Sequence, residues 1–373
     1  MKKSKHLRIL FGAVDIGYRI EYYSSFIKNR LSDKLTAESF SKYKLPESHY
    51  RTSYTYTCPI DKTHPLVLYT YSFLFFIFSL FRYDLFHFFS GETLLTRRLR
   101  NTELWIYKLF NKRVIMHFVG ADIRSIKYLD WKSEHFSDFL SGKKGHRITE
   151  SYQDRLIADA REYADFILVS TPDLLRIIPE AIYFPVVLDL KSFLGNTEGE
   201  ISKVEERHNK NGKIVLLHAP SGLKTKGSVH IHEVLDLLKT EFGDQIEIVT
   251  PGKKSGKDYS YSLTRYELID LMCVADIVID QMVVGWYGLK TVEALALGCE
   301  VVCYIEDSLQ AFLFSESPII SANIYTLKNK LTSLINDLID QKPSRIRHLE
   351  WVRKYHTLEN NNEPLLKTWL GEK

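Results

Sequence analysis

Short apolar runs alternate with longer amphipathic segments along the whole chain. Runs rich in branched and aromatic side chains predict buried strands of a parallel sheet, and apolar residues at helical spacing predict the helices that cover it. In the first half, the pattern predicts strands at 7–11, 85–89, 113–118 and 166–169, and helices at 19–30, 73–81, 102–110 and 150–163. In the second half, it predicts strands at 214–218, 246–250, 276–280 and 300–305, and helices at 229–241, 265–274, 289–297 and 327–340.

The pattern is interrupted at Pro185, which is followed by a polar, glycine-bearing stretch. Such a break marks a domain boundary. We therefore expect an α/β protein with two Rossmann-like domains, at 1–187 and 188–345, and helices in 346–373 that pack back onto the first domain. Ligands of such sheets bind outside the carboxyl ends of the strands, so a cleft between two facing sheets is the expected site.

The two halves of the chain differ in charge. Residues 1–187 hold 28 Lys and Arg against 20 Asp and Glu, whereas residues 188–373 hold 22 against 26. A basic half suits an anionic membrane or a phosphorylated acceptor, although an ordinary solvated surface explains it equally well. No nucleic-acid-binding motif accompanies the charge, so a nucleic-acid partner is not expected.

The four cysteines are Cys58, Cys273, Cys299 and Cys303. Their spacing matches no metal site, and we expect buried free thiols in a reducing cytoplasm.

One apolar run, Leu66–Phe81, has no charged residue over 16 positions. It is shorter than the roughly 20 residues that cross a bilayer, so a transmembrane helix is the least favoured interpretation. We expect a helix buried between a sheet and the rest of its domain. The alternative is a helix with one face in the membrane interface, where a lipid-linked acceptor would be found.

Two loops that follow predicted strands suggest anion sites ahead of helices. The first carries Gly12 and Gly17, which let a ligand approach the backbone near a helix start. The second follows His218 and carries Ser221, Lys224 and Lys226. A lysine before a helix start opposes the helix dipole unless an anion lies between them, so this loop predicts a phosphate site. An exposed lysine on a solvated loop is an equal alternative.

A third loop leads into the alanine-rich helix predicted at 289–297. The backbone N–H groups of Gly288, Leu289 and Lys290 would point at a second phosphate. Glu293, one turn into the helix, is placed to accept hydrogen bonds from ribose hydroxyls. A surface glutamate favoured by the helix dipole is the alternative.

The segments HAPSGLKTKG and VADIVIDQMVVGWYGLKTVEALALGCEVVCY resemble the C-terminal nucleotide-sugar domain of the retaining GT-B glycosyltransferases, family 4 or glycosyltransferase group 1 type. LFHFFSGETLL and RVIMHFVGADIRS resemble the N-terminal domain of the same group, and IPEAIYFPVVLDLKSF resembles its interdomain segment. The resemblance implies a GT-B fold of two Rossmann-like domains facing across a cleft. It also implies that a nucleotide-diphosphate sugar binds there and that the sugar passes to an acceptor with retention of configuration.

By position, the resemblance implies catalytic roles for His117, Lys226 and Glu293. Lys226 would contact the diphosphate, Glu293 the ribose and His117 the donor sugar, although a histidine at a strand end is equally often structural. Asp122 and Arg124 match an element of the family that follows this histidine. The loops and the resemblance together predict a donor-binding set of Gly12, Gly17, Asp122, Ser221, Lys224, Lys226, Asp280, Tyr287, Gly288, Leu289, Lys290 and Glu293.

The chain departs from the family pattern at two positions. The glutamate-x7-glutamate motif keeps its second acid, Glu293, but has Gly285 in place of the first, which ordinarily helps to hold the donor sugar. Asp280 and Gln281 are the candidates to replace that acid. Lys224 is the candidate for a basic residue that usually stands shortly before Lys226.

The expected reaction is transfer of a sugar, with retention, from a UDP-sugar to a glycan or lipid-linked acceptor in bacterial surface polysaccharide synthesis. The expected place is the cytoplasm, at the inner face of the cell membrane. No cofactor is expected, and the lack of a D-x-D triplet argues against a metal-bridged diphosphate. Two alternatives stay open. One is a nucleotide-sugar epimerase that uses Asp122, His117 and Asp280, and the other is an inactive homologue that serves as a partner subunit, as Gly285 suggests.

Overall fold

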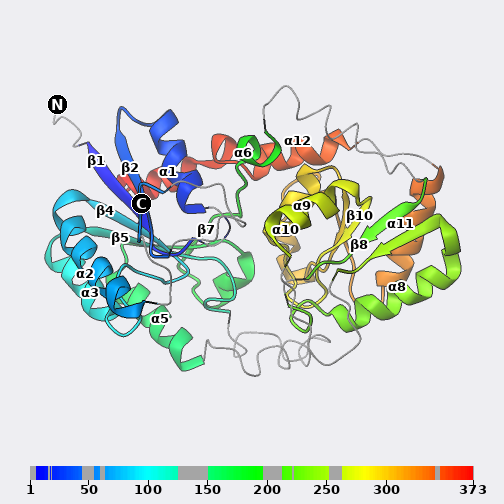
Figure 1. Cartoon of the computed structure of the whole chain (residues 1–373), viewed down its shortest axis with the longest axis horizontal. Helices are drawn as coiled ribbons and strands as arrows, with labels where there is room; N and C mark the ends of the chain where they lie inside the picture. The colour runs from blue at the N-terminus through cyan, green and yellow to red at the C-terminus, as the bar shows by residue number, and fades with distance from the viewer. Residues whose placement is uncertain are drawn as a thin grey trace. The chain divides into compact units, whose positions relative to one another are not determined.

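The computed structural model describes residues 6–15, 17, 19–43, 54–58, 64–124, 150–195, 212–220, 222–251, 263–340 and 345–372. The chain forms two compact units, both drawn in Figure 1. The described residues of unit 1 lie in 6–124, 150–185 and 361–372, and those of unit 2 lie in 186–360. The segment expected as 346–373 is therefore divided: α12 (Ile346–Tyr355) belongs to unit 2 and α14 (Glu363–Leu370) to unit 1.

Unit 1 is built on a seven-stranded sheet in the order β3-β2-β1-β4-β5-β6-β7, and all its strand pairs are parallel. Its strands are β1 (Leu7–Gly12), β2 (Leu35–Ser41), β3 (Tyr56–Thr57), β4 (Leu85–Phe89), β5 (Arg113–Phe118), β6 (Phe166–Val169) and β7 (Ile182–Tyr183). The order reverses beside β1, so the loops after β1 and β4 flank the position where ligands of open parallel sheets bind.

Alternate side chains of this sheet pack against two sets of helices. On one face, Phe86, Phe88 and Met116 join a core with α2 (Pro65–Arg82), α3 (Arg100–Leu109) and α5 (Glu150–Tyr163). On the other face, Phe11 lies 5.8 Å from Trp369 of α14, and His87 lies 5.8 Å from Tyr23 of α1 (Arg19–Arg30), between ring centroids. A short helix, η2 (Pro172–Arg176), connects β6 to β7.

Unit 2 is built on a five-stranded parallel sheet in the order β12-β11-β10-β8-β9. Its strands are β8 (Ile214–Leu217), β9 (Ile246–Val249), β10 (Ile277–Ile279), β11 (Glu300–Cys303) and β12 (Ile319–Ser321). One face is covered by α8 (Ser228–Phe242) and α11 (Leu327–Asp340). The other is covered by α6 (Leu190–Leu194), α9 (Arg265–Val274), α10 (Leu289–Ala296) and α12. Three short helices complete the unit: η4 (Gly243–Gln245), η5 (Asp307–Phe312) and α13 (Leu358–Asn361), whose last residue belongs to unit 1.

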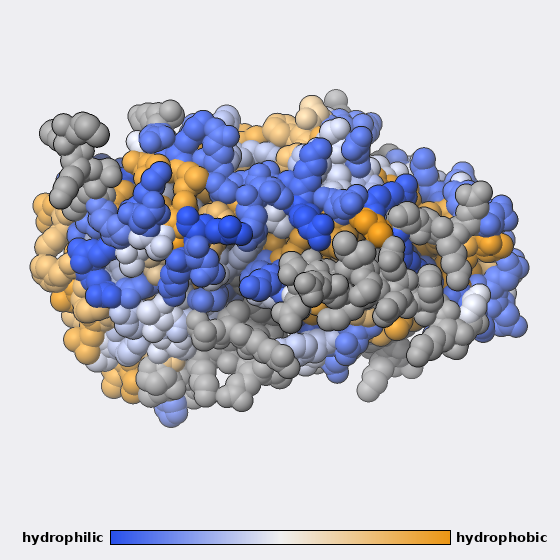
Figure 2. Space-filling model, turned by 90° about the horizontal axis from the view of Figure 1, so that it is seen from above, coloured by the Kyte–Doolittle hydropathy of each residue, from blue (hydrophilic) through white to orange (hydrophobic). Residues whose placement is uncertain are grey.

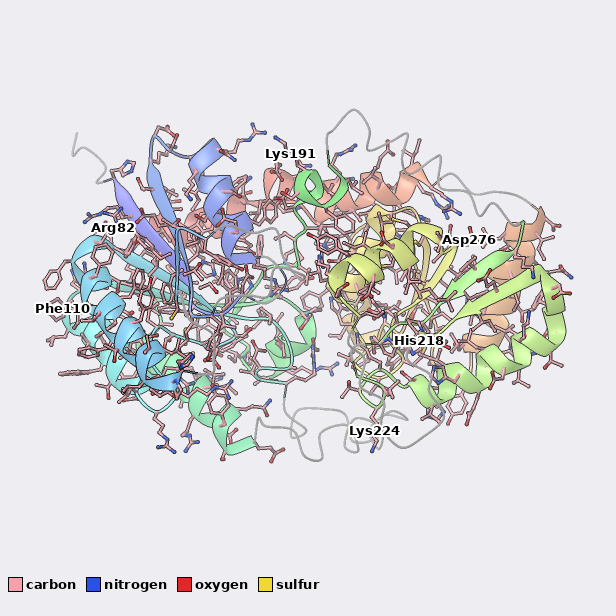
Figure 3. The ribbon with its side chains drawn as sticks, in the orientation of Figure 1. Arg82, Phe110, Lys191, His218, Lys224 and Asp276 are labelled. Atoms are coloured by element: carbon pink, nitrogen blue, oxygen red, sulfur yellow. The ribbon has the colours of Figure 1, made fainter. Side chains whose placement is uncertain are left out.

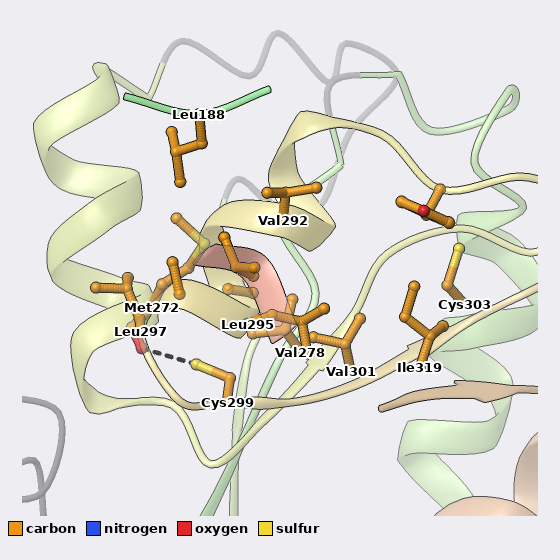
Figure 4. Close-up of a cluster of buried hydrophobic side chains, with 14 of the residues drawn as sticks. Leu188, Met272, Val278, Val292, Leu295, Leu297, Cys299, Val301, Cys303 and Ile319 are labelled. Atoms are coloured by element: carbon orange, nitrogen blue, oxygen red, sulfur yellow. Dashed lines mark hydrogen bonds between the residues drawn. The ribbon is translucent and has the colours of Figure 1, made fainter. Parts of the chain in front are cut away.

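Figure 4 shows the core beneath α10, where Val278 and Val301 of the sheet pack with Val292 and Leu295 of the helix. At its edge, the Cys299 thiol donates a hydrogen bond of 3.2 Å to Met272 O. All four cysteines are free thiols; Cys58, Cys299 and Cys303 are buried as expected, and Cys273 is half-buried.

The α/β prediction with two Rossmann-like parallel sheets is confirmed. Helices α1, α5, α9 and α11 and strands β4, β5 and β6 have the predicted bounds. The pattern missed β2, in which Thr36, Glu38 and Ser39 interrupt the apolar run, and the short strands β3, β7 and β12. It also placed the start of α2 too late, at residue 73, because the prediction did not use Pro65, which occupies the first turn of the helix, where proline marks a helix start.

Candidate functional site

The carboxyl ends of β8 and β10, neighbours in the sheet of unit 2, bring a carboxylate and two ammonium groups together. Asp280 directly follows β10, Lys226 lies in the loop before α8, and Lys290 lies in the first turn of α10. Both lysine Nζ atoms lie 3.1 Å from Asp280 Oδ1. The hydroxyl of Thr291 donates to Oδ2 at 2.8 Å. The structure thus brings together three of the predicted donor-binding residues.

The three charges differ in burial. The Asp280 side chain is fully buried, whereas those of Lys226 and Lys290 keep 22% and 14% of their surface exposed. Burial alone would raise the pKa of Asp280, but the two ammonium groups and the Thr291 hydroxyl outweigh it and hold that pKa well below its usual range. Burial lowers the pKa of Lys290, and Asp280 opposes this shift. With all three ionised, the cluster presents a net positive charge to the surface, which suits an anionic ligand.

Gly227 fixes the backbone beside Lys226. Its φ of 70° lies in the left-handed region, and a Cβ there would lie 3.1 Å from Val283 Cγ2 and 3.2 Å from Met282 Cβ. Met282 N donates a 3.1 Å hydrogen bond to Lys226 O. The Lys-Gly pair therefore binds its own loop to the loop that leads into α10, and only glycine fits beside the lysine.

The start of α10 adds backbone donors to the same edge of the sheet. Gly288 is its N-cap and supplies no side-chain cap. The first N–H groups of a helix lack acceptors within it, and the helix dipole places positive charge there. Gly288, Leu289 and Lys290 are half-buried, so this end of the helix is open to a ligand. The geometry fits the predicted phosphate site.

Glu293, the predicted ribose ligand, forms a buried ion pair. Its side chain is 3% exposed, and its Oε1 lies 2.6 Å from Arg265 NH1 of α9. Burial raises the pKa of Glu293, and the Arg265 charge opposes this rise. Sequence reasoning missed Arg265, because it comes next to Glu293 only through folding. Arg265 itself is 19% exposed, and the ribose contact of Glu293 stays a prediction.

Gly285, which stands where the family pattern has its first acid, is adjacent to a different carboxylate. Its φ is 76°, and a Cβ there would lie 3.0 Å from Glu306 Cβ and 3.3 Å from Glu306 Oε2. Glu306 N also donates to Gly285 O at 3.0 Å. Glu306 follows β11 and is half-buried. Sequence reasoning missed it because the two residues lie far apart along the chain.

The two residues expected to replace the missing acid are engaged elsewhere. Gln281 is fully buried. Its Oε1 accepts hydrogen bonds from Val283 N at 2.8 Å and Val284 N at 2.6 Å, and its Nε2 donates to Trp286 O at 2.9 Å. Asp280 is held by the lysines. Both side chains therefore position the loop and the cations, and neither presents an oxygen to a sugar.

His117, predicted to contact the donor sugar, is fully buried in unit 1. Its Nε2 lies 2.9 Å from Ser170 Oγ and its Nδ1 lies 3.3 Å from His87 Nε2. His87 Nδ1 in turn accepts a 3.2 Å hydrogen bond from Trp369 Nε1. Burial lowers the pKa of both histidines, that of His87 to about 3, so both rings are neutral at pH 7. With both nitrogens engaged, the geometry supports the structural alternative for His117.

Asp122, predicted as a donor contact, closes a turn instead. Its carboxylate accepts hydrogen bonds from Val119 N and Gly120 N, both at 2.8 Å, and from Ile123 N at 3.0 Å. It is 7% exposed, and burial raises its pKa. The next charged residue, Arg124, forms a buried two-pronged pair with Asp173 at 2.6 and 3.2 Å. These bonds shape the loop after β5.

The loop after β1 contains a carboxylate that sequence reasoning missed. Gly12 ends the strand, and Gly17 has a φ of 79°. Between them, Asp15 accepts hydrogen bonds from Arg19 N at 2.9 Å and from the Tyr54 hydroxyl at 3.0 Å. Burial raises the pKa of Asp15 to about 6. The predicted glycines thus frame a polar loop at the switch point of unit 1.

Three further residues of the predicted donor-binding set are Tyr287, Lys224 and Ser221. Tyr287 is 2% exposed, stacks on Trp286 at 4.8 Å and lies 3.3 Å from His356 Nε2 through its hydroxyl, so its side chain is part of the core of unit 2. Its donor contact stays a prediction. Lys224 is exposed and extends away from its loop (Figure 3). Ser221 lies outside the described residues.

His218, at the end of β8, holds the site together from within (Figure 3). Its Nδ1 lies 2.9 Å from Ile279 O and its Nε2 lies 2.8 Å from Ser228 Oγ. Burial, reinforced by the charge of Lys290, lowers the pKa of His218 to about 3. The neutral ring therefore joins β8, β10 and α8 beneath the cations.

Comparisons with known proteins identify the fold. No family model matches the sequence, and no curated protein matches it either. Sucrose-phosphate synthase from Thermosynechococcus elongatus matches with a TM-score of 0.60 and 14% identity, over 97% of this chain and 98% of that chain. HepE from Anabaena, in complex with UDP and glucose, gives 0.55 and 12%, over 98% and 99%. The catalytic domain of starch synthase IV from Arabidopsis thaliana, bound to ADP and acarbose, gives 0.61 and 12%, over 98% and 100%. These structures are GT-B glycosyltransferases, and the chain has their GT-B fold.

Proposed function

We propose that the protein is a glycosyltransferase that moves a sugar from a UDP-sugar to a glycan or lipid-linked acceptor. The observation that carries the proposal is the pair of partly exposed lysines, Lys226 and Lys290, held by buried Asp280 beside the open start of α10. This arrangement suits a diphosphate. The UDP and ADP bound in the similar HepE and starch synthase structures support a nucleotide donor.

The cluster provides a mechanism for departure of the diphosphate. When the bond between the sugar and the phosphate breaks, negative charge grows on the leaving group. Ammonium groups and N–H dipoles that are already in place stabilise this charge more in the transition state than in the ground state. Asp280 keeps both lysines in position, so little reorganisation is needed. Retention of configuration follows the resemblance, and in this proposal the lysines compensate the charge without a metal.

Glu306 is our candidate for the acid that holds the donor sugar. Its carboxylate stands beside Gly285, and Ser308 Oγ donates to its Oε1 at 2.7 Å, which orients it. A carboxylate at this edge could accept hydrogen bonds from sugar hydroxyls. Glu306→Gln is expected to lower affinity for the UDP-sugar and leave affinity for UDP unchanged. The control is Asp307→Asn, which alters the neighbouring exposed residue and should leave both affinities unchanged.

Binding and turnover test the proposal together. Calorimetric titration should show binding of UDP and much weaker binding of uridine, since the cluster would recognise the diphosphate. Mass spectrometry of products from a panel of nucleotide-sugars with glycan acceptors should then show a sugar-extended acceptor. Equal affinity for uridine and UDP would contradict the assignment of the cluster, and UDP binding without any transfer would favour the inactive homologue.

The epimerase alternative receives less support from the side chains. His117 and Asp122, two of the three groups that it would use at the sugar, are buried and engaged in hydrogen bonds. The third, Asp280, is paired with two lysines. Release of UDP that depends on an acceptor would separate transfer from epimerisation.

A further inference from the structure

Helix α2 has apolar side chains on two faces, and unit 1 covers only one of them. Leu68, Phe75, Phe76 and Leu80 are buried in the core. On the opposite side Leu66, Phe73, Leu74, Phe78 and Phe81 are between 44% and 78% exposed. Only 33% of this 18-residue segment is buried, so the expectation of a fully buried helix holds for one face only.

The exposed side chains of α2 continue onto α3. Phe81 of α2 and Phe110, which follows α3, meet edge to face at 6.2 Å between centroids, and Phe110 points outward at the rim of the unit (Figure 3). Figure 2 shows hydrophobic residues along the end of unit 1 where α2 and α3 lie. We call this surface the α2–α3 face; its exposed apolar members are Leu66, Val67, Tyr69, Phe73, Leu74, Ile77, Phe78, Phe81, Leu99, Trp105, Leu109 and Phe110.

The face also contains a groove. It runs between α2 and the loop that leads into α3, and Tyr69, Phe73, Leu95 and Leu99 are among the residues that line it. Exposed apolar surface of this extent, gathered in one place, is unusual for a protein that stays in water, and it marks an interaction site.

The exposed charges of residues 64–111 are of one sign, whereas α5, which packs beside α3, exposes both signs, with Asp154 and Glu162 as well as Arg155 and Arg161. Among residues 64–111 the exposed charged side chains are those of Arg97, Arg98 and Lys108. The acids of that range are less exposed: Glu103 is buried, and Asp84 and Glu92 are 13% exposed. Asp84 is paired with Arg8, and Glu92 is paired with Arg97 of the rim itself. A basic rim attracts an anionic surface, and a second copy of the chain would bring the same positive rim against it.

The observations point to lipid, and we infer that the α2–α3 face docks on an anionic membrane surface. Its apolar side chains would enter the boundary between headgroups and acyl chains, with Trp105 at that level and the three cations at the headgroups. The helix does not span the bilayer in the folded protein, because its other face packs in the core of unit 1. The inference is independent of the proposed function, since it involves neither Lys226 and Lys290 nor a sugar.

Vesicle sedimentation tests this inference with the full chain. Vesicles of phosphatidylcholine with about a third phosphatidylglycerol should pellet the protein, and pure phosphatidylcholine vesicles should pellet much less. The double variant Leu74→Ser/Phe81→Ser should bind the anionic vesicles at least about tenfold more weakly, because it removes two apolar side chains from the contact. Val229→Ser, an equally exposed apolar residue of α8 in unit 2, is the matched control and should bind like the unaltered protein.

A second variant separates charge from apolar contact. Arg97→Gln/Arg98→Gln/Lys108→Gln should lose the preference for phosphatidylglycerol while keeping the apolar face. Failure of the unaltered protein to pellet with anionic vesicles, or equal binding by the Leu74→Ser/Phe81→Ser variant, would overturn the inference. Dimers that form in the absence of vesicles, and that the double variant abolishes, would likewise overturn it in favour of self-association. Unchanged far-UV circular dichroism would establish that each variant is folded.

Discussion

The two units share one architecture but use the polar ends of their strands differently. In unit 1, His117, Asp122 and Arg124 are bonded to neighbouring groups of the same unit and are closed off from solvent. In unit 2, Lys226 and Lys290 are held by a buried partner and still keep part of their surface exposed. The anion binding that we propose for unit 2 therefore depends on charges that are fixed without being enclosed, and the fold alone does not provide this.

The largest expected effect lies in unit 1. Trp369→Ala removes a fully buried side chain that packs on Phe11 and bonds to His87. We expect it to lower the free energy of unfolding by about 3–5 kcal/mol in urea denaturation. The control Trp105→Ala, at an exposed site, should change it by less than about 0.5 kcal/mol. UDP affinity at temperatures where both variants are folded should stay unchanged. A comparable loss in Trp105→Ala would contradict the packing described.

The next effect belongs to unit 2. Lys226→Ala should reduce turnover by about 10²–10³-fold, because it removes a fixed positive group from the leaving phosphate. The fold should persist, since Asp280 keeps Lys290 and Thr291 as partners. Lys224→Ala, on the same loop with an exposed side chain, is the matched control and should lose far less. Equal losses in the two variants would show that the loop acts by general charge only.

Acid should destabilise both units. His87 in unit 1 and His218 in unit 2 each have a pKa lowered to about 3 by burial. The unfolded chain takes up protons on these rings below its pKa of about 6.5, whereas the folded chain does not. The contribution of these two rings to the free energy of unfolding is therefore fully present above pH 6.5, and it is lost as the pH falls towards 3. Each histidine should contribute about 1.4 kcal/mol per pH unit.

Urea midpoints at pH 7.5, 6 and 5 measure this loss. A His218→Gln variant has no ionisable group at this position. The urea midpoint of unit 2 should therefore fall less steeply with decreasing pH in this variant, and that of unit 1 should fall as before. Midpoints that do not change between pH 7.5 and 5 would be incompatible with buried neutral rings.

The smallest effect concerns the loop before α10. Gly285→Ala puts a Cβ at 3.0 Å from Glu306 Cβ and a side chain on a left-handed backbone. We expect a cost of about 1–3 kcal/mol in thermal or urea unfolding. Gly288→Ala is the control, because its Cβ would meet nothing within 4 Å, and it should cost less than about 1 kcal/mol. A stable Gly285→Ala protein would show that the loop moves away from Glu306.

Sequence patterns predicted the helices and strands well because a parallel sheet imposes long apolar runs on the chain. They also singled out Lys226, Asp280 and Lys290, since each lies in a loop that follows a recognisable strand or in the first turn of a helix. They could not find Arg265 or Glu306, which come next to Glu293 and Gly285 only through folding. They could not show that His117 and Tyr287 are buried, because a side chain at a strand end or in a motif looks the same whether it faces solvent or the core.

The helix that carries Trp369 has a consequence for how the chain is made. Unit 1 takes α14 from residues 361–372, after the whole of unit 2. On the ribosome, this face of the first sheet must therefore wait with α1 but without α14 packed on it while all the strands of the second sheet are synthesised. A chaperone that shields Phe11 and Tyr23 during that interval, or a tag fused directly behind α14, would act on the part of the protein that was translated first.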